Sequence, residues 1–132
     1  MPHVLLIDDD DDIIQVNRLA LERSGHAVSA ARSAQEGWDF LMKTAPDAIV
    51  LDVMMEEFNA GFTLAQDINV KFPRIPIVMM TSVREHMNRG WTFSKENDSK
   101  WIPVQRFHEK PVKPDQLVKA IDEVIEEATA RR

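Results

Sequence analysis

The chain has 132 residues, 44% of them hydrophobic, a formal net charge of −6 and no cysteine. This length suits one globular domain, and the lack of cysteine excludes disulfides and thiol chemistry and fits a cytoplasmic protein. We expect no direct nucleic-acid binding from so acidic a chain. We expect no signal peptide, because the first residues have no basic region before the apolar run and no cleavage site, and no membrane span, because no apolar run approaches about 20 residues.

The first three predicted elements are a strand, a helix and a strand. Residues 3–7, HVLLI, are short and apolar, which predicts a buried strand. Residues 12–25 carry apolar side chains at helical spacing and end at Gly25, which predicts a helix. Residues 27–31, AVSAA, predict a second and weaker strand.

The alternation continues through the middle of the chain. A helix is predicted over 33–46, because Ser33 and Glu36 have capping-box spacing and Pro46 is a stop signal. Residues 48–53, AIVLDV, predict a strongly buried strand.

The second half of the chain is partly less regular. A helix is predicted over 61–73 and a fourth strand over 75–82. Residues 83–103 show no clear pattern, 104–110 predict a fifth strand, and 113–132 predict an amphipathic helix. Strands that alternate with helices predict an α/β fold with a parallel sheet covered on both faces. No linker interrupts this pattern, so we expect one domain over residues 1–132 with no output domain in this chain.

Polar residues stand at the carboxyl ends of four predicted strands. Asp8 and Asp9 follow the first strand, Asp52 ends the third, Thr81 ends the fourth and Lys110 ends the fifth. Ligands of open α/β sheets bind at this edge. If the first and third strands are neighbours, three carboxylates converge, and a divalent cation such as Mg²⁺ would relieve their repulsion. The hydroxyl and ammonium groups would complete a cradle for a phosphoryl group, with a carboxylate as nucleophile.

This constellation resembles the receiver domain of two-component response regulators, and the resemblance covers nearly the whole chain. That family has an acidic pair after strand one, a phosphoacceptor in an LD-x-MM setting, a hydroxyl residue after strand four, a Lys–Pro pair after strand five and an aromatic residue three positions before that lysine. The corresponding residues here are Asp8, Asp9, Asp52, Thr81, Lys110, Pro111 and Phe107. The resemblance implies a flavodoxin-like, doubly wound five-stranded sheet in the order 2-1-3-4-5.

The resemblance also implies a Mg²⁺ site. Asp9 would bind the cation directly, and Asp8 would act mostly through water. Asp52 would bind the cation and accept the phosphoryl group, and the backbone carbonyl of Met54 would supply a further ligand.

The remaining roles follow from the same resemblance. Thr81 and Lys110 would bind phosphoryl oxygens, Thr81 and Phe107 would form the conformational switch, and the Lys110–Pro111 peptide would be cis. The partners would be a sensor histidine kinase or phosphotransfer protein and a downstream protein target. Such a domain catalyses only its own phosphorylation and dephosphorylation.

Two features depart from the family pattern. Glu56 stands where a proline is usual, and the segment 83–103 is longer than usual and lacks the signature of a fourth helix. Because Gly90 and the ENDS stretch disfavour a helix, we expect at most a short helix near 84–90. Trp91, Phe93 and Trp101 would then either pack on the sheet or form a partner surface.

Several alternatives remain for the acidic run. Asp10, Asp11 and Asp12 are expected to cap and charge-match the first helix. A haloacid-dehalogenase-like Mg²⁺ phosphatase would use Asp8 and Asp10, but it leaves Asp52 without a role. A flavodoxin-like binding module would need a phosphate loop where the aspartates stand, and a degenerate receiver would lack residues that this chain has.

Overall fold

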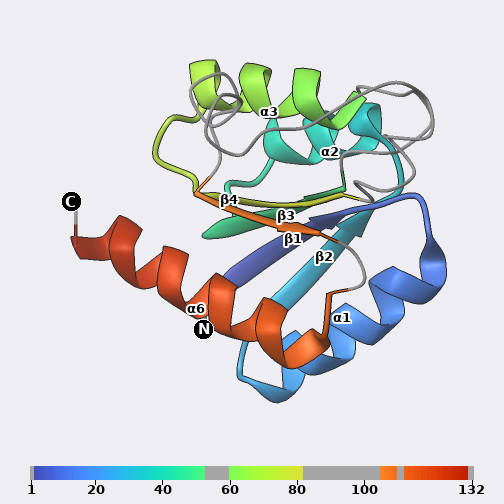
Figure 1. The fold of residues 1–132 in the computed structure, drawn as a ribbon. Coiled ribbons are helices and arrows are strands. Elements are labelled where there is room, and N and C mark those ends of the chain that lie inside the picture. The colour runs from blue at the N-terminus through green and yellow to red at the C-terminus, as the bar shows by residue number, and fades with distance from the viewer. Residues whose placement is uncertain (1, 53–59, 82–104, 110–111, 131–132) are drawn as a thin grey trace.

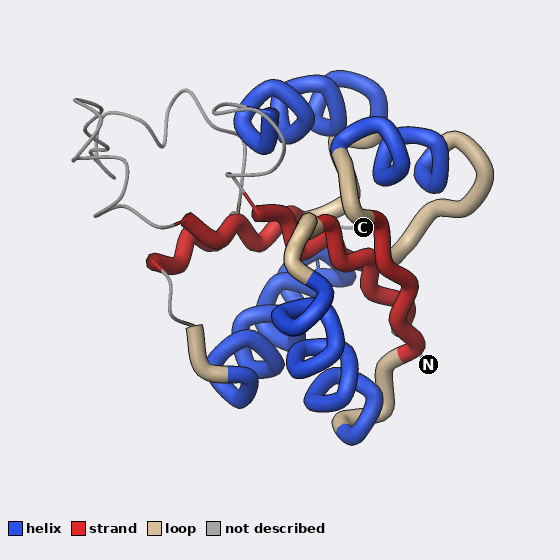
Figure 2. The backbone as a smooth tube through the Cα atoms, turned by 90° about the vertical axis from the view of Figure 1, so that its right-hand side faces the viewer, coloured by secondary structure: helices blue, strands red, loops and turns tan. Residues whose placement is uncertain are grey.

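Five parallel strands form one sheet in the order β2-β1-β3-β4-β5, with helices on both faces (Figures 1 and 2). A computed structural model describes residues 2–52, 60–81, 105–109 and 112–130 of the chain. The strands are β1 (His3–Ile7), β2 (Ala27–Ala31), β3 (Ala48–Asp52), β4 (Ile77–Thr81) and β5 (Arg106–Glu109). The predicted fold class and strand order are confirmed.

Helices α1 and α6 cover one face of the sheet, and α2 and α3 cover the other (Figures 1 and 2). Their bounds are α1 (Asp11–Arg23), α2 (Ala34–Leu41), α3 (Ala60–Lys71) and α6 (Pro114–Ala130). None of the helices in the described ranges is long and apolar enough to cross a membrane. The short helix predicted near 84–90, together with Trp91 and Trp101, lies outside the residues that the structure describes.

Helix α2 ends at Leu41, five residues before the predicted stop at Pro46. The helix ends early because the chain before β3 pairs with the start of β1. The Asp47 N–H donates to the His3 carbonyl at 2.7 Å, and the His3 N–H donates to Asp47 Oδ2 at 2.7 Å. The chain must leave the helix early enough to reach this contact, so tertiary pairing sets the end of α2. The other boundaries within the described ranges lie within two residues of the predicted ones, and those of β1 and β2 coincide with them.

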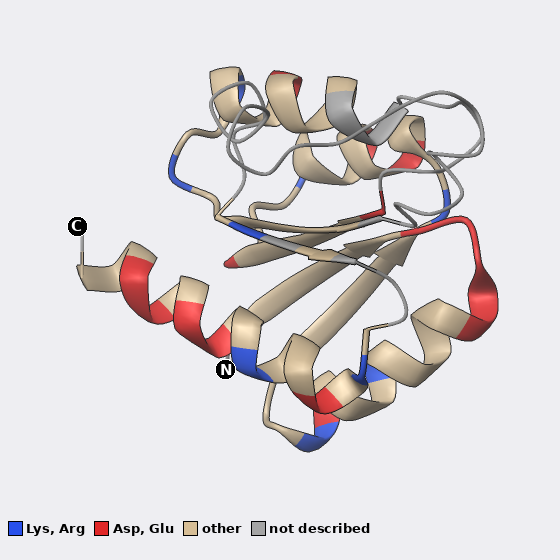
Figure 3. Ribbon diagram, in the orientation of Figure 1, with Lys and Arg blue, Asp and Glu red and all other residues tan. Residues whose placement is uncertain are grey.

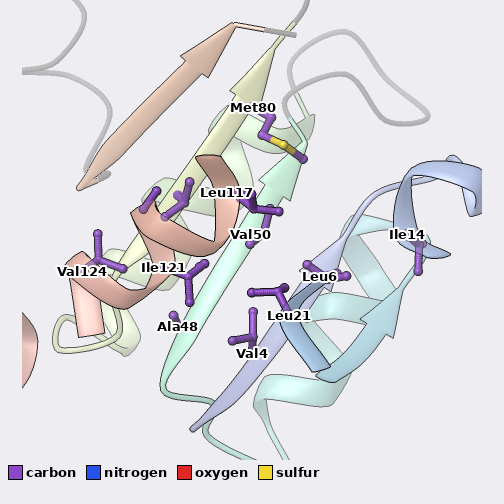
Figure 4. Packing of buried hydrophobic residues seen from close by; sticks show 12 residues of the cluster. Val4, Leu6, Ile14, Leu21, Ala48, Val50, Met80, Leu117, Ile121 and Val124 are labelled. Atoms are coloured by element: carbon purple, nitrogen blue, oxygen red, sulfur yellow. The ribbon is translucent and has the colours of Figure 1, made fainter. Parts of the chain in front are cut away.

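Alternate residues of each central strand face opposite layers of the molecule. Leu5, Ile7, Ile49 and Leu51 pack beneath α2 and α3. Figure 4 shows Val4, Leu6, Ala48, Val50 and Met80 on the other face, where they meet Leu117, Ile121 and Val124 of α6. This alternation directs the next residues in the same series, Asp8 and Asp52, toward the α1 and α6 side of the sheet.

Two glycines stand where other residues would fit poorly, one because of its backbone conformation and one because of a close approach. Gly25 has φ of 94° and follows α1, as expected for the residue that ends a helix. In α2, a Cβ on Gly37 would lie 2.6 Å from Ile7 Cδ1. Helix α2 therefore approaches β1 more closely than a larger residue would allow.

A buried histidine just before β2 forms a hydrogen bond with α6. His26 is 5% exposed, and its Nε2 lies 2.7 Å from Asp122 Oδ1, although the two residues are 96 positions apart. At the far end of the same helix, Arg106 of β5 pairs with Glu127, and this hydrogen bond raises the pKa of Arg106 above its ordinary value.

We expect Asp122→Ala to lower the free energy of unfolding by about 1–3 kcal/mol, because it leaves a buried ring nitrogen without its partner. Asp122→Asn keeps an acceptor oxygen and should cost less. The matched control is Glu126→Ala, an exposed acid on the same helix. Urea denaturation measures all three variants, and equal losses for Asp122→Ala and Glu126→Ala would show that the contact adds nothing to stability.

Candidate functional site

Three aspartates meet where β1 and β3 end. One carboxylate oxygen from each of Asp8, Asp9 and Asp52 lies within 4.8 Å of the other two. Asp8 and Asp52 are each 2% exposed, whereas Asp9 is exposed. Charges of one sign at this spacing and burial repel strongly, so the arrangement calls for a compensating positive charge.

The strand register places these carboxylates together. Strands β1 and β3 are direct neighbours, with Ile7 opposite Leu51, so the residues that follow in each strand, Asp8 and Asp52, share one edge. The Asp8 N–H donates to the Ala31 carbonyl at 3.0 Å, which extends the pairing with β2 by one residue and holds the backbone at this point. The convergence of carboxylates that the sequence predicts is therefore present.

Asp10, Asp11 and Asp12 stabilise the N-terminus of α1. Asp8 Oδ1 accepts from the Asp10 N–H at 2.9 Å, and Asp10 Oδ1 accepts from the N–H groups of Asp12 and Ile13 at 2.9 and 3.3 Å. Asp10 is thus the N-cap, and Asp11 and Asp12 occupy the first turn, where negative charge is favourable. Figure 3 shows this acidic segment running from the end of β1 into α1. The predicted capping role is confirmed.

Arg32 flanks the acidic segment from the end of β2. Its Nε donates to Asp11 Oδ1, and its backbone N–H donates to Glu36 Oε2 at 2.7 Å. The Glu36 N–H in turn donates to Ser33 Oγ at 3.1 Å. Half of the predicted capping box is therefore as expected, but the glutamate side chain reaches Arg32 and not the N-cap residue. Sequence reasoning did not identify the ion pair, because its members are 21 residues apart.

The remaining predicted site residues are described in part or not at all. Thr81 ends β4 and stands opposite Glu109 of β5 in the register, and Phe107 stands opposite Met79. The structure describes the backbone of Thr81 and Phe107, and their side chains are outside its description. Met54, Lys110 and Pro111 also lie outside the described residues. The roles assigned to these five residues stay predictions.

The donor set of the cluster fits a hard divalent cation. All three side chains offer oxygen, and the described residues of the cluster include neither cysteine nor histidine. Mg²⁺ prefers a small number of carboxylates together with carbonyl, water and phosphate oxygens. Asp10 does not belong to this cluster, because its carboxylate is occupied by the N–H groups of α1.

Sequence reasoning missed one further polar residue near the cluster. Asn17 lies in α1 between Ile14 and Leu21 on the buried side of the helix and is 5% exposed. It lines a recess that Asp8 also lines. The available signal was a polar residue at a position where the helical period calls for an apolar one.

Comparison with known proteins gives a consistent result. The family model described as "Response regulator receiver domain" matches residues 4–122. The chain is 40% identical over 82 residues, 62% of its length, to the transcriptional regulatory protein AfsQ1 of Streptomyces coelicolor, of which it covers 36%. It is 26% identical over 125 residues, 95% of its length, to the response regulator SaeR of Staphylococcus aureus, of which it covers 51%. The chain thus spans about a third to a half of these relatives.

Solved structures share the fold. A CheY-like receiver domain protein from Methanospirillum hungatei superposes with a TM-score of 0.85 at 23% identity, covering 100% of this chain and 99% of that one. The response regulator protein TrrA of Thermotoga maritima, solved in complex with Mg²⁺ and BeF, has a TM-score of 0.77 at 19% identity, covering 94% of this chain and 99% of that one. At such identities the similarity shows the fold alone.

Proposed function

The chain belongs to the response regulator receiver domain family, which functions in phosphorelay signalling, and from this premise we propose that Asp52 is its phosphoacceptor. The observation that carries the proposal is the position of Asp52. Its carboxylate is buried at the end of a central strand, and one of its oxygens lies within 4.8 Å of oxygens from both Asp8 and Asp9.

Asp8, Asp9 and Asp52 would hold the cation, with the backbone carbonyl of Met54 as a further ligand. When bound, Mg²⁺ supplies positive charge that offsets the three carboxylates and polarises phosphoryl oxygens. The proposal is supported by the oxygen donor set and by the complex of TrrA with Mg²⁺ and BeF, a similarly folded protein.

The chemical step is transfer of a phosphoryl group between two residues. A carboxylate oxygen of Asp52 forms a bond to phosphorus while the bond from phosphorus to the imidazole nitrogen of a phosphohistidine breaks, and that nitrogen keeps the bonding electrons. The products are an acyl phosphate on Asp52 and a neutral imidazole after proton equilibration. Thr81 and Lys110 would bind oxygens of the transferred group, where an ammonium and a hydroxyl stabilise charge.

The signalling step would use Thr81 and Phe107 as the switch, with Pro111 following Lys110 in a cis peptide. The proposal draws on the register, which places β4 and β5 side by side with their carboxyl ends at the edge that holds Asp52. A change in the position of Thr81 could therefore pass to β5 and to the surface beyond it.

The proposed partners are a sensor histidine kinase or phosphotransfer protein as donor and a protein as downstream target. Residues 1–132 would act as one receiver domain in the cytoplasm, without contacting nucleic acid themselves. Some relatives are named as transcriptional regulatory proteins, but this chain spans only part of their length, so that activity belongs to those longer proteins.

The proposal treats the domain as a phosphoacceptor that catalyses only its own phosphorylation and dephosphorylation. The alternative, a phosphatase with Asp8 and Asp10 as its catalytic pair, is disfavoured because Asp10 Oδ1 caps α1.

Incubation with acetyl phosphate and Mg²⁺ tests the proposal. We expect intact-mass spectrometry to show the addition of one phosphoryl group, and hydroxylamine to remove it, as expected for an acyl phosphate. Omission of Mg²⁺ with EDTA is the control and should prevent labelling. A protein that remains unlabelled with both acetyl phosphate and a phosphorylated histidine donor would refute the proposal.

A further inference from the structure

Asn17 is a polar residue at a position where the fold calls for an apolar one. The core-facing side of α1 presents Ile14, Asn17 and Leu21, and all three are buried. Ile14 and Leu21 pack in the apolar layer between the sheet and α1 (Figure 4). Asn17 is 5% exposed, and no hydrogen bond joins its amide group to another of the described residues, although the amide keeps a small contact with solvent.

Among the described residues that line the recess with Asn17, one other is polar. The recess that it lines is formed otherwise by Asp8 and by apolar side chains, among them Leu6, Ile13, Val50 and Met80. Leu6, Val50 and Met80 project from β1, β3 and β4 on the face covered by α1 and α6 (Figure 4). The recess therefore lies directly beneath the edge of the sheet at which Asp8 and Asp52 end their strands.

Placing an amide in a mostly buried, largely apolar recess costs free energy that a leucine at the same place would avoid. A residue that holds a metal-binding carboxylate in position can offset this cost, because it increases the affinity of the site for the metal. We propose that Asn17 is a positioning residue for Asp8: its amide donates a hydrogen bond that steadies the Asp8 carboxylate when a divalent cation binds. This inference rests on the proposed function of the aspartate cluster.

Two variants with opposite effects on packing separate this role from a structural one. Asn17→Leu replaces the amide with apolar atoms in similar space and should raise the melting temperature in EDTA. Asn17→Ala leaves a cavity and should lower it. Because both remove the amide, we expect both to weaken Mg²⁺ binding about tenfold. The control is Ile14→Val, which alters the same face of α1 without removing a polar group.

The measurement is the melting temperature as a function of Mg²⁺ concentration, from which the dissociation constant follows by linkage. A tenfold loss in both Asn17 variants and none in Ile14→Val supports the proposal, because stability and affinity then change independently. Unchanged Mg²⁺ affinity in the Asn17 variants, or an equal loss in Ile14→Val, overturns it. Wild-type protein that binds no Mg²⁺ would overturn the proposed function as well, so the two failures are distinguishable.

Discussion

Asp52→Asn is expected to abolish phosphoryl incorporation from acetyl phosphate, because the neutral amide is not a nucleophile as the carboxylate is. The amount of labelled protein should fall at least about 100-fold. Asparagine has nearly the same shape, so the buried end of β3 should keep its packing. Removing one of three mutually repelling charges should leave the fold in EDTA at least as stable as the wild type. The loss of labelling would therefore report chemistry and not unfolding.

Asp12→Asn is the matched control for this experiment. Asp12 belongs to the same acidic run, is exposed, and lies in the first turn of α1 outside the cluster. It should label like the wild type, as measured by intact mass and hydroxylamine sensitivity. Undiminished labelling of Asp52→Asn would refute the assignment of the phosphoacceptor. Steady phosphate release by Asp52→Asn that disappears in Asp8→Asn would instead favour the phosphatase alternative.

Mg²⁺ is expected to stabilise the wild-type fold, and Asp9→Ala is expected to remove most of this stabilisation. A ligand that binds the folded state at ten times its dissociation constant contributes about 1.4 kcal/mol, which corresponds to roughly 5 °C in melting temperature for a domain of this size. Asp9 is the exposed member of the cluster, so its truncation removes a ligand without opening a cavity in the core.

The Asp9 variant also makes a prediction without the cation. Because the repulsion among Asp8, Asp9 and Asp52 falls, Asp9→Ala should melt at the same or a higher temperature than the wild type in EDTA. Asp12→Ala serves as the control and should keep the full Mg²⁺-dependent shift in thermal melts. If Asp9→Ala also keeps the full shift, the carboxylate of Asp9 is not a ligand of the stabilising cation.

Local sequence patterns were enough to predict the α/β fold class and the positions of the strand ends. Short apolar runs such as 48–52 and helical periodicity such as that of 114–130 are local patterns, and a chain of this length can bury them in few ways. The N-cap role of Asp10 and the start of α2 after Ser33 were likewise predictable, because capping is a contact between residues at most three positions apart.

Other features depend on contacts between segments that are distant in the sequence, and these emerge only in the folded molecule. Helix α2 ends at Leu41 because Asp47 must reach His3, and His26 is buried because Asp122 of α6 meets it. The aspartates of one run have different roles because strand register brings Asp8 beside Asp52, while Asp10 turns to the N–H groups of α1. The sequence pattern did not single out Asn17, and only the packing of α1 against the sheet places it in a recess with Asp8. Local patterns do not predict such pairings, because the free energy that favours them arises only when the layers of the fold are packed together.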